Sequence, residues 1–204
     1  MVALATSLIG CAGAGEVFQL ASTTAFSFML APLPQTYRLT VKGMTVPAGK
    51  FEENAFPESL RKNIYVTEIE GTETLKHLNG IALDAHDDSN VKAALSNSLN
   101  LAGLLNTDQK VARYQLSTVV TENRSSGAAD VTVTTHLQFV LTEAATRETL
   151  LQESIATPST VPVSEELLYK DRVGKAMEGS VKGDIRALLE RLKQIPIDGG
   201  GPAS

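Results

Sequence analysis

The sequence has no tryptophan, only 5% aromatic residues and a single cysteine, Cys11. Single-stranded nucleic acids and sugars are bound on exposed aromatic faces, so the shortage of aromatics argues against either ligand. A lone cysteine excludes an internal disulfide. There are 18 lysines and arginines against 23 aspartates and glutamates, and the resulting net charge of −5 repels a phosphate backbone. The composition therefore argues against a nucleic-acid partner.

No stretch approaches the roughly 20 apolar residues of a membrane-spanning helix. The segment 25–33 (AFSFMLAPL) is short and is stopped by Pro32 and Pro34. At 204 residues and 43% apolar composition, the chain can bury the core of one domain without disulfides or metals. We predict a signal remnant over residues 1–10, a tether over 11–34, one folded domain over 35–195 and a flexible tail over 196–204.

The cysteine follows a short run of small and apolar residues. Leu8-Ile9-Gly10-Cys11 resembles the lipobox of bacterial lipoproteins, in which a leucine and two small or apolar residues precede an invariant cysteine. The resemblance implies that the signal is cleaved before Cys11, that its thiol carries a diacylglycerol and that its new amino group is often acylated. Each buried CH₂ contributes about 0.8 kcal/mol, and stable anchoring takes more than one acyl chain. Such a residue would tether the domain to a membrane.

The amino terminus also leaves a second interpretation open. A secretory signal normally has a basic start and about 15–30 residues, whereas only ten residues, none of them lysine or arginine, precede Cys11. Either Met1 lies inside a longer signal, or residues 2–20 form a small-residue helix with an unreactive cysteine. Under the first interpretation Ala12 and Gly13 follow the cysteine, and no aspartate stands beside it. By resemblance to enteric lipoproteins, this implies the outer rather than the inner membrane.

Hydrophobic periodicity predicts an α+β domain, a two-layer sandwich whose mostly antiparallel sheet of four to five strands is packed by two helices. Alternation at period two predicts strands over 37–42, 114–120 and 131–142. The β-branched content of 63–70 predicts another strand, and 149–156 is expected to return as a further strand after a turn. Spacings of three and four predict helices from about Ser89 to Gly103 and over 166–194. We expect turns at 79–80, 124–127 and 144–148, and expect Pro158 and Pro162 to end the last strand. Three glycines in the last helix, Gly174, Gly179 and Gly183, indicate close approach to the sheet or a kink.

This order of elements is similar to that of the lipopolysaccharide-assembly lipoprotein family of LptE and of auxiliary lipoproteins of ABC-type lipid transporters. The similarity covers roughly residues 63–192 together with the lipobox. Its most family-like stretches are Ser96 to Leu105 (SNSLNLAGLL) and Tyr114 to Val120, which are patterns rather than specific motifs. The resemblance implies a non-catalytic protein that docks on an envelope complex.

Residues that carry chemistry are few. Asp84, His86, Asp87 and Asp88 are the one tempting metal cluster, but their spacing matches no EF-hand loop. Acids just before a helix also interact favourably with its dipole, and we favour that account. His136 alternates onto the polar face of its strand, and the charges of the last helix, Asp184 among them, resemble a solvated face. We therefore expect no catalytic residue, no metal site and no cofactor.

Three functions follow, in decreasing order of support. The first is a lipid-anchored accessory lipoprotein on the periplasmic side of the envelope, docking on a transport or assembly complex. The alternative is a small module that binds a lipid or a cell-wall fragment, and the third is a hydrolase or transferase with a dispersed site. A large surface patch favours the first, a closed apolar pocket the second, and buried acids with perturbed pKa in a cleft the third.

Overall fold

The computed structural model describes residues 55–78, 81–82 and 88–196, all within a unit that spans residues 36–204. Our predictions for Cys11, the tether, the 37–42 strand and the turn at 79–80 lie outside these residues. The sheet has four strands in the order β1-β4-β5-β6, and a short β2-β3 pair lies beside it. The elements are η1 (Glu58–Leu60), β1 (Ile64–Glu70), α3 (Glu73–Lys76), β2 (His77–Leu78), β3 (Ile81–Ala82), α4 (Asp88–Leu101), β4 (Tyr114–Ser126), β5 (Val131–Glu143), β6 (Thr149–Val161) and α5 (Tyr169–Leu192).

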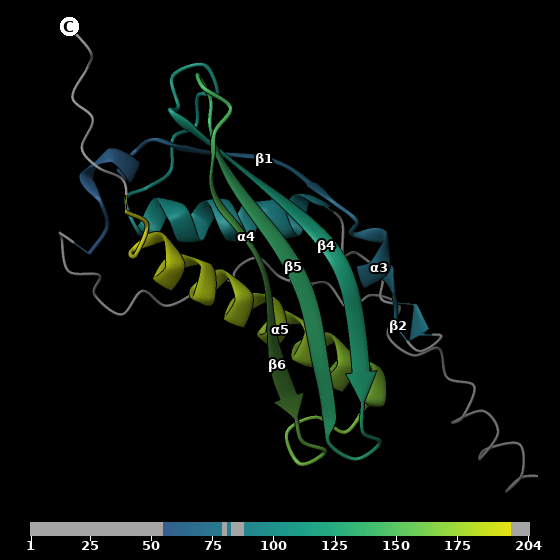
Figure 1. The fold of residues 1–204 in the computed structure, drawn as a ribbon. Coiled ribbons are helices and arrows are strands. Elements are labelled where there is room, and N and C mark those ends of the chain that lie inside the picture. Colours follow the sequence, from purple (N-terminus) through teal and green to yellow (C-terminus); the bar gives the residue numbers. More distant parts are fainter. Residues whose placement is uncertain (1–54, 79–80, 83–87, 197–204) are drawn as a thin grey trace, which may run out of the picture. The chain divides into compact units, whose positions relative to one another are not determined.

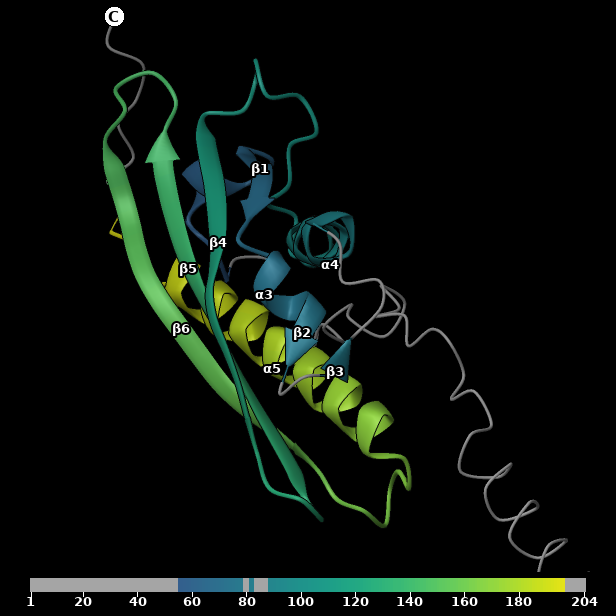
Figure 2. The same cartoon turned by 90° about the vertical axis from the view of Figure 1, so that its right-hand side faces the viewer.

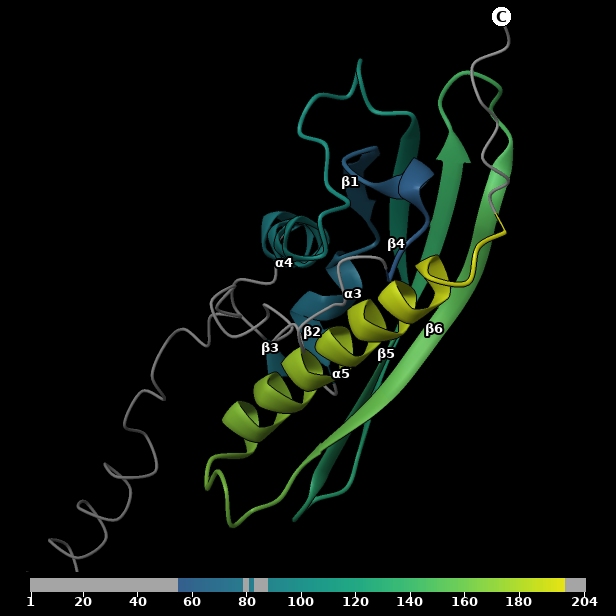
Figure 3. The ribbon, with the colours of Figure 1, turned by 90° about the vertical axis from the view of Figure 1, so that its left-hand side faces the viewer.

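The predicted α+β architecture is confirmed. Strands β4, β5 and β6 form an antiparallel meander, while β1 pairs with β4 in parallel. A parallel pair needs a crossover, and α4 lies within the one that joins β1 to β4. Figure 1 shows α4 and α5 with the sheet, and Figures 2 and 3 show that both helices lie on one side of it. No helix among the described residues is both long and apolar enough to cross a membrane.

The end of α4 follows from a glycine, as predicted. Gly103 has a φ of +72°, a left-handed conformation that is easy for glycine. The Leu104 N–H donates to the Leu99 carbonyl at 2.9 Å, and the Gly103 N–H donates to the Asn100 carbonyl at 3.0 Å. This pair of bonds is the Schellman motif, which satisfies the last carbonyls of a helix. The chain then leads buried Leu104 into the core.

The alternation predicted for β5 is confirmed along the whole strand. Its odd-numbered residues from Val131 to Leu141 are buried and face the helices, whereas the residues between them are half-buried. Leu137 and Phe139 are completely buried, and they belong to the same core as Leu95 and Leu99 of α4. One face of the sheet therefore carries the core, and the other is not covered by any described helix.

The glycines of α5 allow it to approach β6 closely. A Cβ atom on Gly183 would lie 2.5 Å from Thr157 Cγ2, and one on Gly179 would lie 2.1 Å from Ser159 Oγ. Real Cβ atoms essentially never come within 3.0 Å of another heavy atom. Of the two alternatives that the sequence left open, close approach is the one observed at both positions.

Three local predictions were wrong. Strand β6 runs through Pro158 to Val161, because an edge strand tolerates a residue that has no N–H to donate. Strand β4 continues to Ser126, which pairs with Thr132, so the turn lies at 127–130 rather than at 124–127. In α4, helical spacing also places Leu101 beside the predicted apolar stripe of Val91, Leu95 and Leu99, but Leu101 is 53% exposed.

Candidate docking surface

The side of the sheet that no described helix covers includes Tyr65 and Glu70 of the edge strand β1, which pair with Gln115 and Val119 of β4. The larger part of this side, which we call the open face, is made by alternate residues of the three long strands. Register pairs fix its members, because residues directly opposite each other in an antiparallel pair point to the same face. The open face comprises Gln115, Ser117, Val119, Glu122, Arg124 and Ser126 of β4, Thr132, Thr134, His136, Gln138, Val140 and Thr142 of β5, and Gln152, Ser154, Ala156, Pro158 and Thr160 of β6. In Figure 2 these strands lie on the side away from α4.

Charge is scarce on the open face. Its members on β5 and β6 include no aspartate, glutamate, lysine or arginine, although 20% of the whole chain is charged. The two charges on β4, Glu122 and Arg124, form an ion pair with each other. Ordinary soluble surfaces carry roughly 25–35% charged residues, whereas the centres of protein interfaces are depleted of charge. The open face therefore has the composition of an interface rather than of a solvated sheet.

A hollow of about 380 Å³ lies where the open face meets the β5–β6 turn. It is lined by Thr67, Gln109, Gln115, Ser117, Thr142, Glu143, Ala144 and Arg147. At its edge the Arg113 Nε donates to Glu143 Oε1 at 2.9 Å. Hydrogen bonds from the Thr146 hydroxyl and from Arg113 lower the pKa of Glu143, which keeps this carboxyl ionised.

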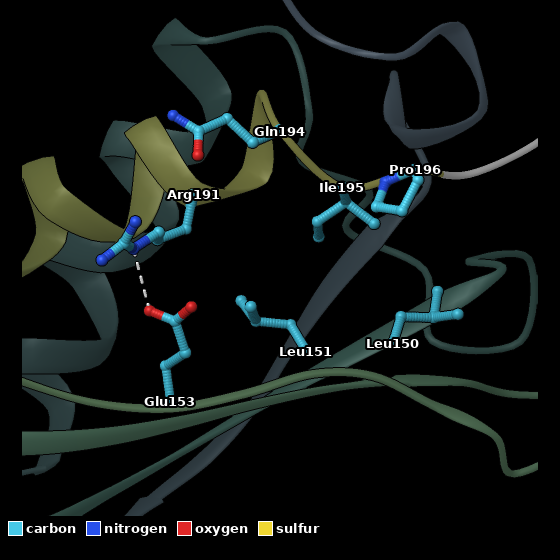
Figure 4. Close-up of a pocket in the computed structure, with 7 residues that line it drawn as sticks. All are labelled: Leu150, Leu151, Glu153, Arg191, Gln194, Ile195 and Pro196. Carbon is cyan, nitrogen blue, oxygen red and sulfur yellow. Dashed lines mark ion pairs between the residues drawn. The ribbon is translucent and has the colours of Figure 1, made fainter.

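A second hollow, of about 240 Å³, lies where α5 ends beside the start of β6. Figure 4 shows Leu150, Leu151, Ile195 and Pro196 on one side of it and the ion pair of Arg191 with Glu153 on the other. The Arg191 Nε lies 3.0 Å from Glu153 Oε2. Pockets for drug-sized ligands usually measure about 300–1,000 Å³ and enclose most of the ligand. This hollow is smaller than that range.

A row of polar groups lies buried between α5 and the sheet. The Thr135 N–H donates to Ser180 Oγ at 2.8 Å, and the Ser180 hydroxyl donates to the Thr157 carbonyl at 2.6 Å. The Thr157 N–H donates to Asp184 Oδ1 at 2.6 Å. Thr135 and Thr157 are register partners on β5 and β6. Two side chains of α5 thus bond the strand backbones just before Pro158, which has no N–H of its own.

Asp184 corrects our interpretation of α5. We expected it on a solvated face, but its exposed fraction is zero. Burial raises the pKa of Asp184 to about 7, and the hydrogen bonds from Thr157 oppose this rise. Its Oδ2 atom has no hydrogen-bond partner among the described residues. Neither hollow includes this carboxyl, so its position gives it no access to a substrate through them.

The sequence contained a signal for this placement. Asp184 follows Ser180 by four residues and precedes Leu188 by four, and both of these are buried. It therefore belongs to the apolar stripe of α5 by helical spacing. Residue type alone had assigned it to solvent.

The other residues that the sequence analysis considered for a site are Cys11, the 84–88 cluster and His136. Cys11 and positions 84–87 are outside the described residues, and Asp88 is the first residue of α4. His136 lies on the open face as expected, with its Nε2 3.8 Å from Glu122 Oε2. Glu122, the partner of His136 in the described structure, was not among the residues that the sequence singled out.

This chain resembles known proteins in its fold rather than in its sequence. No protein-family model and no curated protein matches the sequence. The structure is similar to that of a Xanthomonas campestris protein of family DUF330, with a TM-score of 0.51 and 10% identity over 68% of this chain and 90% of that chain. A lipoprotein candidate from Caulobacter crescentus gives a TM-score of 0.47 with 12% identity over 76% of this chain and 96% of that one. A minor lipoprotein from Acinetobacter baumannii gives 0.44 with 10% identity over 66% and 93%. The chain therefore shares the fold of the DUF330 protein.

Proposed function

We propose that this chain is a lipid-anchored, non-catalytic accessory lipoprotein of the bacterial envelope, which docks on a transport or assembly complex through the open face. The observation that carries the proposal is the scarcity of charge on a sheet face that no described helix covers and that is built from three strands of 13 residues each. The lipobox-like segment that ends at Cys11 supports the anchor. The resemblance of the same segment to the start of enteric lipoproteins supports a position at the outer membrane, on its periplasmic side.

The docking partner is a protein with a neutral polar surface. The open face consists mainly of threonine, serine, glutamine and small apolar residues, and its one arginine, Arg124, is paired with Glu122. It therefore offers neither a free cationic site for phosphates nor an apolar area for acyl chains. Hydroxyl and amide groups form hydrogen bonds with a matching surface at little desolvation cost compared with charges. The face is also preformed, since β5 lies between two hydrogen-bonded neighbours along its length.

Introducing charge into the open face tests the docking step. Gln138 and Ser154 are register partners at the middle of β5 and β6. We expect Q138K/S154K to lose a larger complex that the wild type forms in a detergent extract of the cells that produce it, as seen on native gels. The thermal midpoint should move by no more than about 4 °C, because both changes lie on the surface. The matched control is Glu148→Lys on the exposed β5–β6 turn, which should leave the complex intact.

The anchor has a separate test. Cells fed an alkyne analogue of palmitate should label the wild type, whereas Cys11→Ser should be unlabelled and should appear in the soluble fraction. Equal labelling of both proteins would overturn the anchor. A wild type that runs as a monomer, or a complex that survives Q138K/S154K, would overturn docking through the open face.

The module that binds a lipid or cell-wall fragment has weaker support. The hollow in Figure 4 does combine apolar side chains with an ion pair, as a small amphipathic ligand requires. However, its volume of about 240 Å³ would leave much of an acyl chain or a saccharide exposed.

A further inference from the structure

An apolar tip projects between β6 and α5, at the opposite end of α5 from the hollow of Figure 4. In this segment, residues 162–168, Leu167 is 81% exposed, Val163 41% and Leu168 40%. Isolated apolar residues on a surface are normal, but three within six positions form a patch. The other large apolar residues exposed among the described ones, Leu101 and Val111, lie on other elements.

The tip is held in place by a buried arginine. Arg172, in the first turn of α5, is only 5% exposed. Its Nη1 donates to the carbonyls of Glu166 and Leu167, both at 2.7 Å, and its Nη2 donates to the Ala128 carbonyl at 3.2 Å. The guanidinium also lies over the Tyr169 ring, 5.6 Å from its centre. A charged group is thus buried to fix the backbone that carries Leu167.

Two further contacts fix the flanks of the tip. Lys175 Nζ lies 2.7 Å from Glu166 Oε2, and the Val163 N–H donates to Asp130 Oδ1 at 3.3 Å. An apolar loop that is already ordered loses little entropy when a partner covers it, and this raises affinity. The tip is therefore preorganised for contact rather than left exposed by a loose loop.

The charges around the tip select among partners. Asp130, Glu165, Glu166 and Asp171 lie in or beside it, against Lys170, Arg172 and Lys175. Because Arg172 is buried, four carboxylates and two ammonium groups remain toward the surface of the tip. Lys175 is committed to Glu166, and its pKa is raised first by that hydrogen bond and further by the charges of Glu165 and Asp171. The acidic surroundings repel anionic lipid headgroups and attract lysine and arginine. The apolar centre of the tip and the acidic residues around it are therefore complementary to an apolar socket with a basic rim.

We propose that the apolar tip is a recognition element which inserts Leu167 into an apolar socket of a protein partner, with lysine or arginine at the rim of that socket. This inference rests on the proposed function in that the partner is a component of the envelope complex. It adds a second contact, at the end of the domain, to the contact made by the open face.

Photo-crosslinking in the cells that produce the protein tests the inference. Benzoyl-phenylalanine is placed at position 167, at position 138 on the open face, or at position 111 as a control, since Val111 is 68% exposed on a different loop. We expect position 167 to give one discrete protein adduct whose crosslinked segment, identified by mass spectrometry, is apolar with flanking lysine or arginine. Position 111 should not give this adduct.

Charge reversal makes the test specific. We expect E165K/D171K to lower the yield of the adduct at position 167 at least about fivefold, because like charges would then meet at the rim. Replacing the identified lysine or arginine of the partner by glutamate should restore the yield. A loop that contacts proteins nonspecifically through its apolar residues would not show this restoration.

The outcomes separate this inference from the proposed function. Adducts to lipid or to a second copy of this chain at position 167, or an equal adduct at position 111, would overturn the recognition element. So would an adduct at position 138 without one at 167, and in that case docking through the open face would stand. Failure of both positions to crosslink a protein would overturn the proposed function as well.

Discussion

The two faces of β5 belong to one strand and share its hydrogen-bonded neighbours, but the side chains on one face are mostly apolar and those on the other mostly polar. Toward the helices the strand presents valine, leucine and phenylalanine, all buried, with Thr135 as the polar exception. Toward the open side it presents threonine, histidine, glutamine and one valine. The first face supplies the free energy of folding. The second is neither apolar enough to be a core nor charged enough to be an ordinary surface, and this is the combination expected of a docking face.

The difference predicts that mutations on the two faces affect different properties. Changes toward α5 should lower the free energy of unfolding, whereas changes on the open side should leave it unchanged and alter association. Neighbouring residues on one strand provide matched pairs for this comparison, because backbone pairing and strand propensity are nearly the same for both members.

Phe139→Ala should have the largest effect. Its side chain is completely buried, and truncation removes apolar area while leaving a cavity, at a cost of about 3–5 kcal/mol. The adjacent Val140→Ala should cost under about 1 kcal/mol, since Val140 is half-buried on the open face. Urea unfolding of both variants measures the contrast. Similar losses for the two would mean that the open face is covered in the folded protein.

Asp184→Asn should remove a dependence of stability on pH. The pKa of Asp184 rises from an unfolded value of about 3.9 to about 7, so the native state holds its proton more tightly than the unfolded state does. The contribution of Asp184 to the free energy of unfolding is therefore largest below pH 4, decreases as the pH rises from 4 to 7 and stays constant above pH 7. We expect D184N to be more stable than the wild type by about 2–4 kcal/mol at pH 8, relative to any difference at pH 4.

The measurement is urea unfolding at both pH values. Glu178→Gln provides the matched control, because it also removes one carboxyl from α5 but takes it from a partly buried ion pair with Lys182 rather than from the row of polar groups between α5 and the sheet. Equal pH profiles for D184N and the wild type would mean that Asp184 is charged and satisfied in the folded state.

Much of the fold could be predicted from the sequence because its patterns are strong. The alternation over 131–142 and the stripe from Val173 to Leu192 each identify an element and its buried face, and Gly103 locates the end of α4. Strand ends were less predictable. Pro158 has no N–H to donate, which would end a central strand, and the sequence does not reveal that β6 is an edge strand. Pairing partners, which decide such cases, are properties of the tertiary structure.

The candidate surfaces were harder to predict. The sequence indicated a polar face for β5, but the open face depends on which strands are neighbours and on which side the helices pack. Leu167 resembled part of the helix predicted over 166–194, yet α5 begins at Tyr169 and leaves it outside. Buried Asp184 and Arg172 were missed because charged residues are rarely buried, and only their contacts reveal the exception.

Gly183→Ala tests the close approach of α5 to the covered face. Alanine normally stabilises a helix interior relative to glycine by up to about 1 kcal/mol. Here the new Cβ would lie 2.5 Å from Thr157 Cγ2 and 2.7 Å from Thr157 Cβ, so β6 or the helix must shift. We expect a net loss of about 1–2 kcal/mol. In a Thr157→Gly background the same change should cost less, and a double-mutant cycle measures that coupling. Stabilisation by G183A in the wild type would contradict the packing.

His136→Ala should have the smallest effect, although its chemistry makes it a natural candidate for function. Its Nε2 is 3.8 Å from Glu122 Oε2, and the ring is about one-third exposed on the open face. Glu122 is also paired with Arg124, so loss of the imidazole leaves that carboxylate partnered. Exposed ion pairs contribute about 0–1 kcal/mol, and an ordinary surface change stays within about 0.5 kcal/mol. We therefore expect a shift in the free energy of unfolding below about 0.5 kcal/mol, measured beside Gln138→Ala as the neighbouring open-face control.

If H136A leaves stability unchanged but abolishes the complex that Q138A retains, His136 is a specific contact of the docking face. A large loss of stability would mean that the His136 ring is packed as a core residue is. The open face would then contribute to folding as the covered face does, and the contrast between the two faces of β5 would be wrong.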